Sequence, residues 1–172
     1  TAGVMQVAQL GASNHHMDGP LGPFRSRRAI GRKMATVDVT DKNFREVTER
    51  DGIAILDLWA TWCVPCREEM PALHALEKEK GGENFEVVAV NIDVGADEKP
   101  KAFMEEYKID ALKHYRDSSM GVFNVLKKEG LAFGLPATLL LDEKGCLLAA
   151  MNGPAAWDSE DAKALISAMK AK

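Results

Sequence analysis

The sequence predicts an α/β fold in which helices flank a central mixed sheet, built as a βαβ half and a ββα half with a helical insertion between them. Two nearly continuous apolar runs, residues 53–59 and 85–92, enclose a helix-like stretch at 67–80. Such runs are typical of parallel strands covered on both faces. The run 137–141 and the stretch 146–151 then read as a hairpin, and an amphipathic helix follows. Together these observations predict the two halves.

The chain has 172 residues and 46% apolar composition, enough for one domain with a full hydrophobic core. We expect a flexible leader or linker at residues 1–34, rich in Gly, Ser, Asn and Pro, and a domain at 35–172. The net charge is -4, but the leader carries only Asp18 as an acid. Its basic residues are Arg25, Arg27, Arg28, Arg32 and Lys33.

Charge and hydropathy exclude some classes of protein. No basic face with interleaved aromatics is visible, so we expect no nucleic-acid partner. The sequence has no run of about 18 apolar residues that could span a membrane, and no signal peptide opens it. Because the chain begins with Thr1, we expect a processed product whose targeting segment or membrane anchor has been removed. We also expect a monomer.

The first half of the predicted domain begins with a short edge strand at 34–39. Thr40 would cap a helix that carries Phe44 and Val47 on one face. The strand 53–58 follows, then the helix at 67–80 with a kink at Pro71, then the strand at 85–92.

Two amphipathic stretches, 97–107 and 118–128, form the predicted helical insertion, and Gly130 would terminate the second helix. The hairpin at 137–151 turns at residues 142–145. Asp158 would cap the last helix. Its apolar residues fall at helical spacing: Ala162, Leu165, Ile166 and Met169.

Cys63 and Cys66 lie between the first core strand and its helix. A lone Cys-x-x-Cys could be half a zinc site, but strand, dithiol and helix in this order indicate redox chemistry. The unpaired N–H groups of a helix N-terminus stabilise a thiolate, which makes Cys63 nucleophilic. Cys66 is then within reach to resolve a mixed disulfide. Cys146 is expected to be a small packed residue, or else to pair with a cysteine outside this chain.

Asp57 lies on the strand that precedes the dithiol. If it is buried, its pKa rises and it could accept the Cys66 proton during resolution; the alternative is a hydrated aspartate at the sheet edge. Pro136 precedes a core strand, where a cis bond would aim backbone groups at the dithiol, although trans is the commoner state of an X-Pro bond. We expect Trp62 to be an exposed docking residue and Trp59 to lie in the core.

The remaining candidates are expected to be structural or exposed. Arg67, Glu68 and Glu69 read as ordinary residues of the first helical turn. His74 and His114 lack a second ligand at metal spacing, and the His15-His16-Met17 run reads as a flexible polar segment.

At residues 58–67, 69–73, 85–93, 134–138 and 153–157 the chain resembles TlpA, the membrane-anchored periplasmic thioredoxin-like proteins of bacteria. The match covers about residues 36–170 and implies a thioredoxin-like fold.

Site roles follow from this resemblance. It implies that Cys63 attacks, that Cys66 resolves and that Pro136 is a cis proline facing them. Leu135 resembles reducing members of the family. The substrate-docking residues would be Trp62, Val64, Pro65 and Leu135. At Asp57, TlpA proteins often carry Asn, so resolution here is expected to be more like that of thioredoxin.

The resemblance further implies a disulfide reductase without a bound cofactor, in the bacterial periplasm. Its partners would be disulfide-bearing protein clients and a membrane thiol electron donor. Clients in the family belong to cytochrome c maturation or to copper-centre assembly of cytochrome oxidase. Two alternatives remain open: a disulfide oxidase or isomerase, and a chaperone that holds Cu(I) or zinc on its thiolates. The reduction potential separates the redox alternatives, because reductants lie near about -270 mV and strong oxidants near about -120 mV.

Overall fold

The computed structural model describes residues 35–40, 42–48 and 51–170. The leader expected at 1–34, including His15-His16-Met17, lies outside the described residues. The strands are β1 Thr36–Asp38, β2 Ile53–Trp59, β3 Phe85–Asn91, β4 His114–Arg116, β5 Ala137–Leu141 and β6 Leu147–Asn152. The helices are α1 Phe44–Thr48, α2 Val64–Lys80, α3 Glu98–Glu106, α4 Gly121–Lys128 and α5 Glu160–Lys170.

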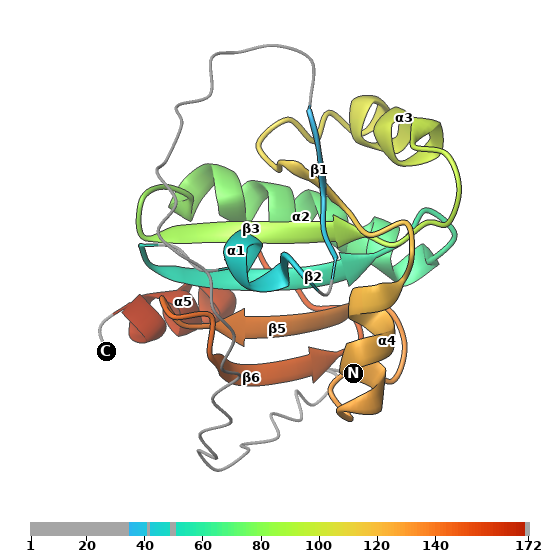
Figure 1. The fold of residues 1–172 in the computed structure, drawn as a ribbon. Coiled ribbons are helices and arrows are strands. Elements are labelled where there is room, and N and C mark those ends of the chain that lie inside the picture. The colour runs from blue at the N-terminus through green and yellow to red at the C-terminus, as the bar shows by residue number, and fades with distance from the viewer. Residues whose placement is uncertain (1–34, 41, 49–50, 171–172) are drawn as a thin grey trace.

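The strands form one mixed sheet in the order β1-β4-β3-β2-β5-β6. The four strands from β1 to β2 run parallel, and β5 and β6 are antiparallel to their neighbours. In Figure 1, α2 and α5 lie behind the sheet, whereas α1 and α4 lie in front of it. An ion pair of 2.8 Å between Lys163 and Glu79 joins α5 to α2. The predicted thioredoxin-like fold class is therefore confirmed.

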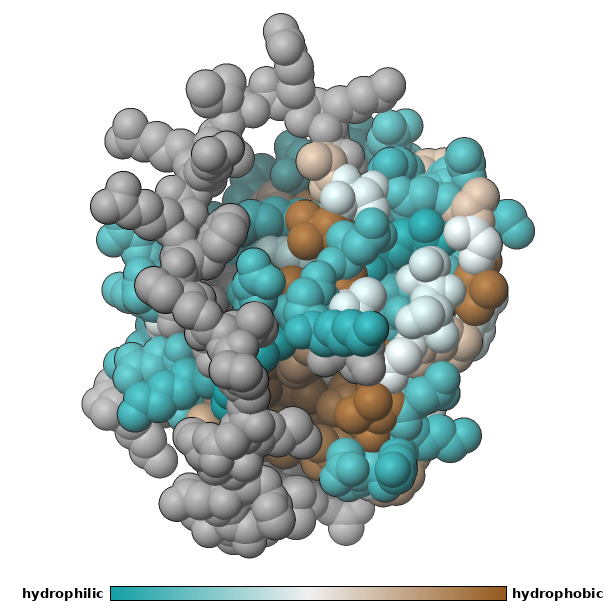
Figure 2. All heavy atoms as spheres, viewed as in Figure 1, coloured by the Kyte–Doolittle hydropathy of each residue, from teal (hydrophilic) through white to brown (hydrophobic). Residues whose placement is uncertain are grey.

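The core is centred on β2 and β3. All seven residues of β2 are buried, as are six of the seven of β3, because helices cover both faces of the central strands. β6 is an edge strand with Leu147 and Leu148 exposed. Among the coloured residues of the face in Figure 2, hydrophilic ones predominate, and hydrophobic ones gather over β5 and β6. In the described part of the chain, no helix is both long and apolar enough to cross a membrane.

The insertion was predicted to be helical, and this is only partly right. It also contains strand β4, which lies between α3 and α4. Of its residues, His114 and Arg116 are polar and nevertheless buried. Asp97 makes this possible, since it lies 2.6 Å from His114 Nε2 and 3.4 Å from Arg116 Nε and accepts a 2.6 Å hydrogen bond from the Thr36 hydroxyl. A strand buried through ion pairing lacks the apolar pattern by which strands are recognised in sequence.

Two helix starts differ from the predictions. Thr40 accepts a hydrogen bond from the Asn43 N–H, but α1 begins only at Phe44. At α5 the Ser159 hydroxyl, rather than Asp158, accepts the N–H of Ala162. Both predicted caps are therefore displaced along the chain.

α4 begins at Gly121, three residues later than expected. It ends as predicted, since Gly130 follows it with a positive φ of 72°.

Cys146 was expected to be packed, and this is wrong, because the side chain is exposed and unpaired. It lies in the turn between β5 and β6, where Asp142 forms hydrogen bonds with both of its backbone groups. The Cys146 N–H donates to Asp142 Oδ1 at 2.8 Å, and its carbonyl accepts from the Asp142 N–H at 2.9 Å.

Candidate redox site

A disulfide joins Cys63 to Cys66 at the N-terminus of α2. Cys63 is the N-cap of the helix, and its Sγ accepts a hydrogen bond of 3.3 Å from the Cys66 N–H. Cys63 is 6% exposed, whereas Cys66 is fully buried. A thiolate at this helix terminus would receive the same N–H donor and the positive end of the helix dipole.

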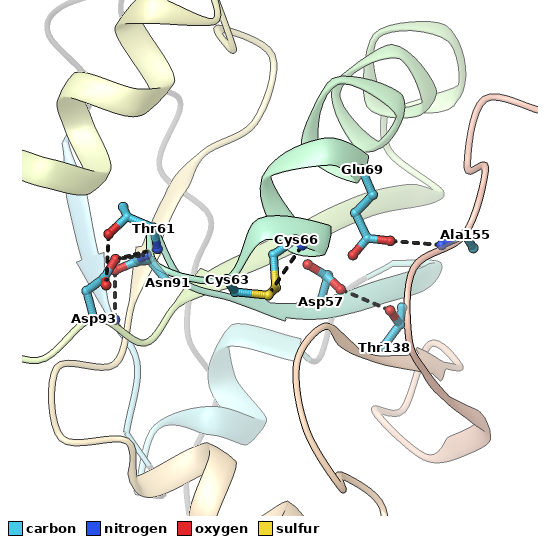
Figure 3. The surroundings of a disulfide bond; sticks show 9 residues. All are labelled: Asp57, Thr61, Cys63, Cys66, Glu69, Asn91, Asp93, Thr138 and Ala155. Carbon is cyan, nitrogen blue, oxygen red and sulfur yellow. Dashed lines mark hydrogen bonds between the residues drawn. A yellow bond between two sulfur atoms is a disulfide. The ribbon is translucent and has the colours of Figure 1, made fainter.

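Asp57 lies on β2, opposite Thr138 of β5, and is fully buried. The Thr138 hydroxyl donates to Asp57 Oδ1 at 2.9 Å (Figure 3), while Oδ2 has no hydrogen-bond partner among the described residues. Burial raises the pKa of Asp57 well above its ordinary value, repulsion from Glu69 raises it further, and the Thr138 bond lowers it. The interpretation of Asp57 as a hydrated residue at the sheet edge is therefore wrong.

Glu69 was expected to be an ordinary helix residue, and this too is wrong. It is 3% exposed and points toward Asp57 from α2, and its Oε2 accepts the Ala155 N–H at 3.0 Å (Figure 3). Burial raises its pKa to about 7, against the lowering effect of the Ala155 bond. The Trp157 indole also favours its charged form, although the geometry falls short of a hydrogen bond.

Helical spacing could have identified Glu69. The buried positions on this face of α2 are Cys66, Glu69, Met70 and Leu73, which follow the pattern i, i+3, i+4 and i+7. A carboxyl at such a position faces the core.

Asp93 follows β3 on the other side of the disulfide and was not among the predicted site residues. It is 6% exposed, and its Oδ2 accepts the Thr61 N–H at 2.9 Å and the Asn91 amide at 2.8 Å. Its Oδ1 accepts the Thr61 hydroxyl at 3.0 Å. Asp93 therefore fixes the loop that leads into Cys63. Since β2 and β3 are parallel, the residues that follow them meet at one edge of the sheet, and this rule could have suggested the contact.

The Leu135-Pro136 bond is cis, as the resemblance implies. Pro136 is buried immediately before β5, and its carbonyl accepts the Gly153 N–H at 3.0 Å. Leu135 and Pro65 are half-buried, whereas Trp62 and Val64 are 63% and 59% exposed.

Trp59 lies in the core as predicted, with its ring centroid 5.4 Å from that of Phe103. Arg67 places its guanidinium 5.5 Å from the same Phe103 ring, and Glu68 is exposed. His74 Nε2 lies 2.9 Å from Asp110 Oδ1, and His114 Nε2 lies 2.6 Å from Asp97 Oδ1. Each imidazole is therefore paired with an aspartate rather than with the dithiol. Within the described ranges, no three His, Cys, Asp or Glu side chains form a group that could hold a metal ion.

Comparison with known proteins agrees with this geometry. The profile of the Redoxin family matches residues 29–166. The chain is 35% identical over 101 residues to the thioredoxin-like protein YneN of Bacillus subtilis, covering 54% of this chain and 52% of that protein. It is 33% identical over 106 residues to a thioredoxin of Pseudomonas aeruginosa, covering 60% of this chain and 95% of that protein.

Solved structures show the same fold. A candidate thiol:disulfide interchange protein DsbE of Chlorobium tepidum superposes with a TM-score of 0.57 at 25% identity, over 69% of this chain and 80% of that one. The exposed lipoprotein thioredoxin Etrx1 of Streptococcus pneumoniae gives 0.55 at 20% identity, over 72% and 87%. The chain spans about half the length, 52%, of the first curated relatives it matches.

Proposed function

Because the chain belongs to the Redoxin family, we propose that it is a thiol-disulfide oxidoreductase that reduces disulfides of protein clients. The observation that carries this proposal is the Cys63–Cys66 disulfide at the start of α2, with the buried acids Asp57 and Glu69 beside it (Figure 3). A reversible dithiol next to groups that can hold a proton is what two-step disulfide exchange requires.

In the proposed reaction the Cys63 thiolate attacks one sulfur of a client disulfide. A Cys63–client mixed disulfide forms, and the other client sulfur leaves as a thiolate. Cys66 then loses its proton and attacks Cys63 Sγ. The client departs as a dithiol and the protein is left with the Cys63–Cys66 disulfide, two electrons having passed to the client. An external dithiol donor returns it to the reduced form.

We assign the attacking role to Cys63 because it is the more exposed of the two sulfur-bearing residues and caps the helix. Cys66, which is fully buried, resolves the mixed disulfide. Asp57 accepts its proton and the neighbouring Glu69 supports it, because burial raises the pKa of both carboxyls and a carboxyl with a raised pKa is a stronger base. We assign the guiding of the client to Pro136 and Leu135, as the resemblance implies, together with the exposed Trp62 and Val64.

We further propose that the protein acts outside the cytoplasm on clients of copper-centre assembly or cytochrome c maturation, with a membrane thiol donor. The resemblance to TlpA supports these clients. The structural similarity to the exposed lipoprotein thioredoxin Etrx1 supports a location outside the cytoplasm.

The test is to trap clients covalently. The full chain carrying Cys66→Ser cannot resolve a mixed disulfide, and Cys146→Ser in the same chain removes the exposed third thiol. We expect this protein to retain client proteins that dithiothreitol releases, and the matched variant with Cys63→Ser to retain none. If no client is trapped and the wild type is also inert toward insulin disulfides, the proposal is wrong.

The direction of electron flow needs a separate measurement. Equilibration with glutathione or dithiothreitol buffers gives the reduction potential. A reductase is expected near about -270 mV, and a value near about -120 mV would instead support the oxidase alternative.

A further inference from the structure

The segment between β6 and α5 lies against the acid pair of Asp57 and Glu69. The Gly153 N–H donates to the Pro136 carbonyl at 3.0 Å, just before β5. The Ala155 N–H donates to Glu69 Oε2 at 3.0 Å (Figure 3). The segment is therefore fixed both beside β5 and to α2. The reaction proposed above uses none of its side chains.

Trp157 ends this segment and is buried, with 2% of its surface exposed. Its indole Nε1 has no hydrogen-bond partner among the described residues, and neither has Glu69 Oε1. A buried N–H and a buried carboxylate oxygen that both lack a partner are uncommon, because removing either from water costs free energy. The indole is close enough to Glu69 to favour its charged form. The two atoms are therefore a matched donor and acceptor.

Asp57 is the charged group that faces Glu69. Figure 3 shows Glu69 pointing from α2 toward Asp57 on β2. Burial raises the pKa of Asp57 most, and repulsion from Glu69 raises it further. An ionised Glu69 therefore makes Asp57 a stronger base. The charged side chains that neighbour Glu69 and Trp157 in the chain are exposed: Arg67, Glu68, Asp158 and Glu160.

We propose that Trp157 is a positioning residue for the proton acceptor: its indole N–H binds Glu69 Oε1 when Glu69 is ionised and holds this anion beside Asp57. The inference rests on the function proposed above and adds a residue to the same site. When Cys66 gives up its proton to attack Cys63 Sγ, the proton passes to Asp57, which the neighbouring anion makes a stronger base. In this scheme Trp157 acts only through Glu69.

The first test is the substitution Trp157→Phe, which keeps a buried aromatic ring and removes the N–H. The pKa of Glu69, about 7 in the wild type, should rise by about one pH unit, because the anion loses one of its two donors. The measurement is the NMR shift of the Glu69 carboxyl carbon in the oxidised full chain between pH 5 and pH 9. Glu69→Gln identifies the resonance.

Trp59→Phe is the matched control. Trp59 is also buried, and its Nε1 also lacks a partner among the described residues, but its ring packs against Phe103. This variant loses the same volume and the same kind of N–H, and it should leave the Glu69 midpoint unchanged. An equal movement in both variants would indicate a general effect of a loosened core and would overturn the proposal, as would no movement in Trp157→Phe.

A second measurement leaves Trp157 in place. In the oxidised wild type, the Nε1–H resonance of Trp157 should move downfield as the pH rises through about 7, because the bond forms when Glu69 loses its proton. In Glu69→Gln, which cannot titrate, this movement should be absent. A Trp157 resonance that does not follow the titration of Glu69 would overturn the proposal, even if Trp157→Phe does not fold.

The resolving step gives the functional readout. In chains that also carry Cys146→Ser, Trp157→Phe should slow the attack of Cys66 by about threefold between pH 7 and pH 8, where Glu69 is mostly ionised in the wild type and mostly protonated in the variant. The two rates should converge toward pH 9, where Glu69 is ionised in both. A loss of equal size at every pH would show a merely structural role and would overturn the proposal.

The titrations separate this inference from the proposed function, because the oxidised protein needs no turnover. If the wild type reduces insulin disulfides but the Glu69 midpoint does not move in Trp157→Phe, only the role of Trp157 fails. If the wild type is inert toward disulfides, the proposed function fails whatever the titrations show.

Discussion

Two buried acid sites flank the disulfide and differ in how their carboxyl oxygens are bound (Figure 3). On one side both oxygens of Asp93 accept hydrogen bonds, from Thr61 and Asn91. On the other side Asp57 and Glu69 each have one bonded oxygen and one without a hydrogen bond among the described residues. Buried carboxyls thus have two different roles. Asp93 is a structural clamp, by which we mean that it fixes the loop before Cys63, whereas Asp57 and Glu69 form a titrating pair.

The difference lies in the supply of donors. Asp93 lies where two strands end, and the Thr61 N–H that it accepts is not used by the sheet. Asp57 lies within β2, where the backbone donors are taken by the sheet, so that only the Thr138 hydroxyl reaches it. A buried carboxyl with too few donors keeps its proton to a higher pH, and this is useful for chemistry near neutrality.

The largest expected effect is on folding stability. Asp93→Ala leaves the Thr61 N–H, the Thr61 hydroxyl and the Asn91 amide without their acceptor, and should lower the free energy of unfolding by about 3 kcal/mol. Asp57→Ala removes a carboxyl with a single bond and relieves its burial, so it should cost less than about 1 kcal/mol at pH 7. Urea unfolding of the oxidised proteins measures both, and equal losses would contradict the comparison.

The second effect is on the resolving step. Asp57→Asn keeps an acceptor for the Thr138 hydroxyl but cannot take a proton, so the attack of Cys66 should slow by about a hundredfold at pH 7. In chains that also carry Cys146→Ser, which removes the exposed third thiol, reaction of the reduced protein with 5,5′-dithiobis(2-nitrobenzoate) releases thionitrobenzoate in two phases. The second phase reports resolution. An unchanged second phase and an unchanged pH profile between pH 5 and pH 9 would show that Asp57 is not the proton acceptor.

The third effect is the pH dependence of stability. The pKa of Glu69 is raised from 4.5 to about 7 in the folded protein, so between these values the folded state binds more protons than the unfolded state. The stabilisation is complete below pH 4.5 and is lost as the pH rises through 7. The free energy of unfolding should fall by about 2 kcal/mol between pH 5 and pH 7.

Glu69→Gln is the matched variant for this effect, because it keeps an acceptor for the Ala155 N–H and removes the titration. The difference between wild type and variant isolates Glu69 from the other groups. A difference that is constant from pH 5 to pH 7, or that grows in favour of the wild type as the pH rises, would be inconsistent with the raised pKa.

The two acid sites also show which parts of the structure could be predicted from the sequence and which could not. The apolar runs at β2 and β3 and the Cys-x-x-Cys pattern are local signals, so the fold class and the dithiol followed directly from them. Asp57 was predicted because it interrupts a buried strand. Glu69 and Asp93 were missed although helical spacing and the parallel strands place them near the dithiol, because their partners Ala155 and Thr61 are brought close only by the fold. Strand β4 was missed for a related reason, since two of its three buried side chains, His114 and Arg116, are polar and paired with Asp97.

The smallest expected effect separates the two sites through matched threonines. Thr138→Val removes the hydroxyl that lowers the pKa of Asp57, so the pH midpoint of the resolving phase should move upward by less than about one pH unit. Thr61→Val removes one of the bonds to Asp93 but keeps its backbone N–H bond, and should cost about 1 kcal/mol of unfolding free energy without moving that midpoint. The stopped-flow pH profile and urea unfolding are measured on both variants. If Thr61→Val moved the midpoint as far as Thr138→Val, Asp93 would belong to the proton chemistry and the division between a clamp and a titrating pair would be lost.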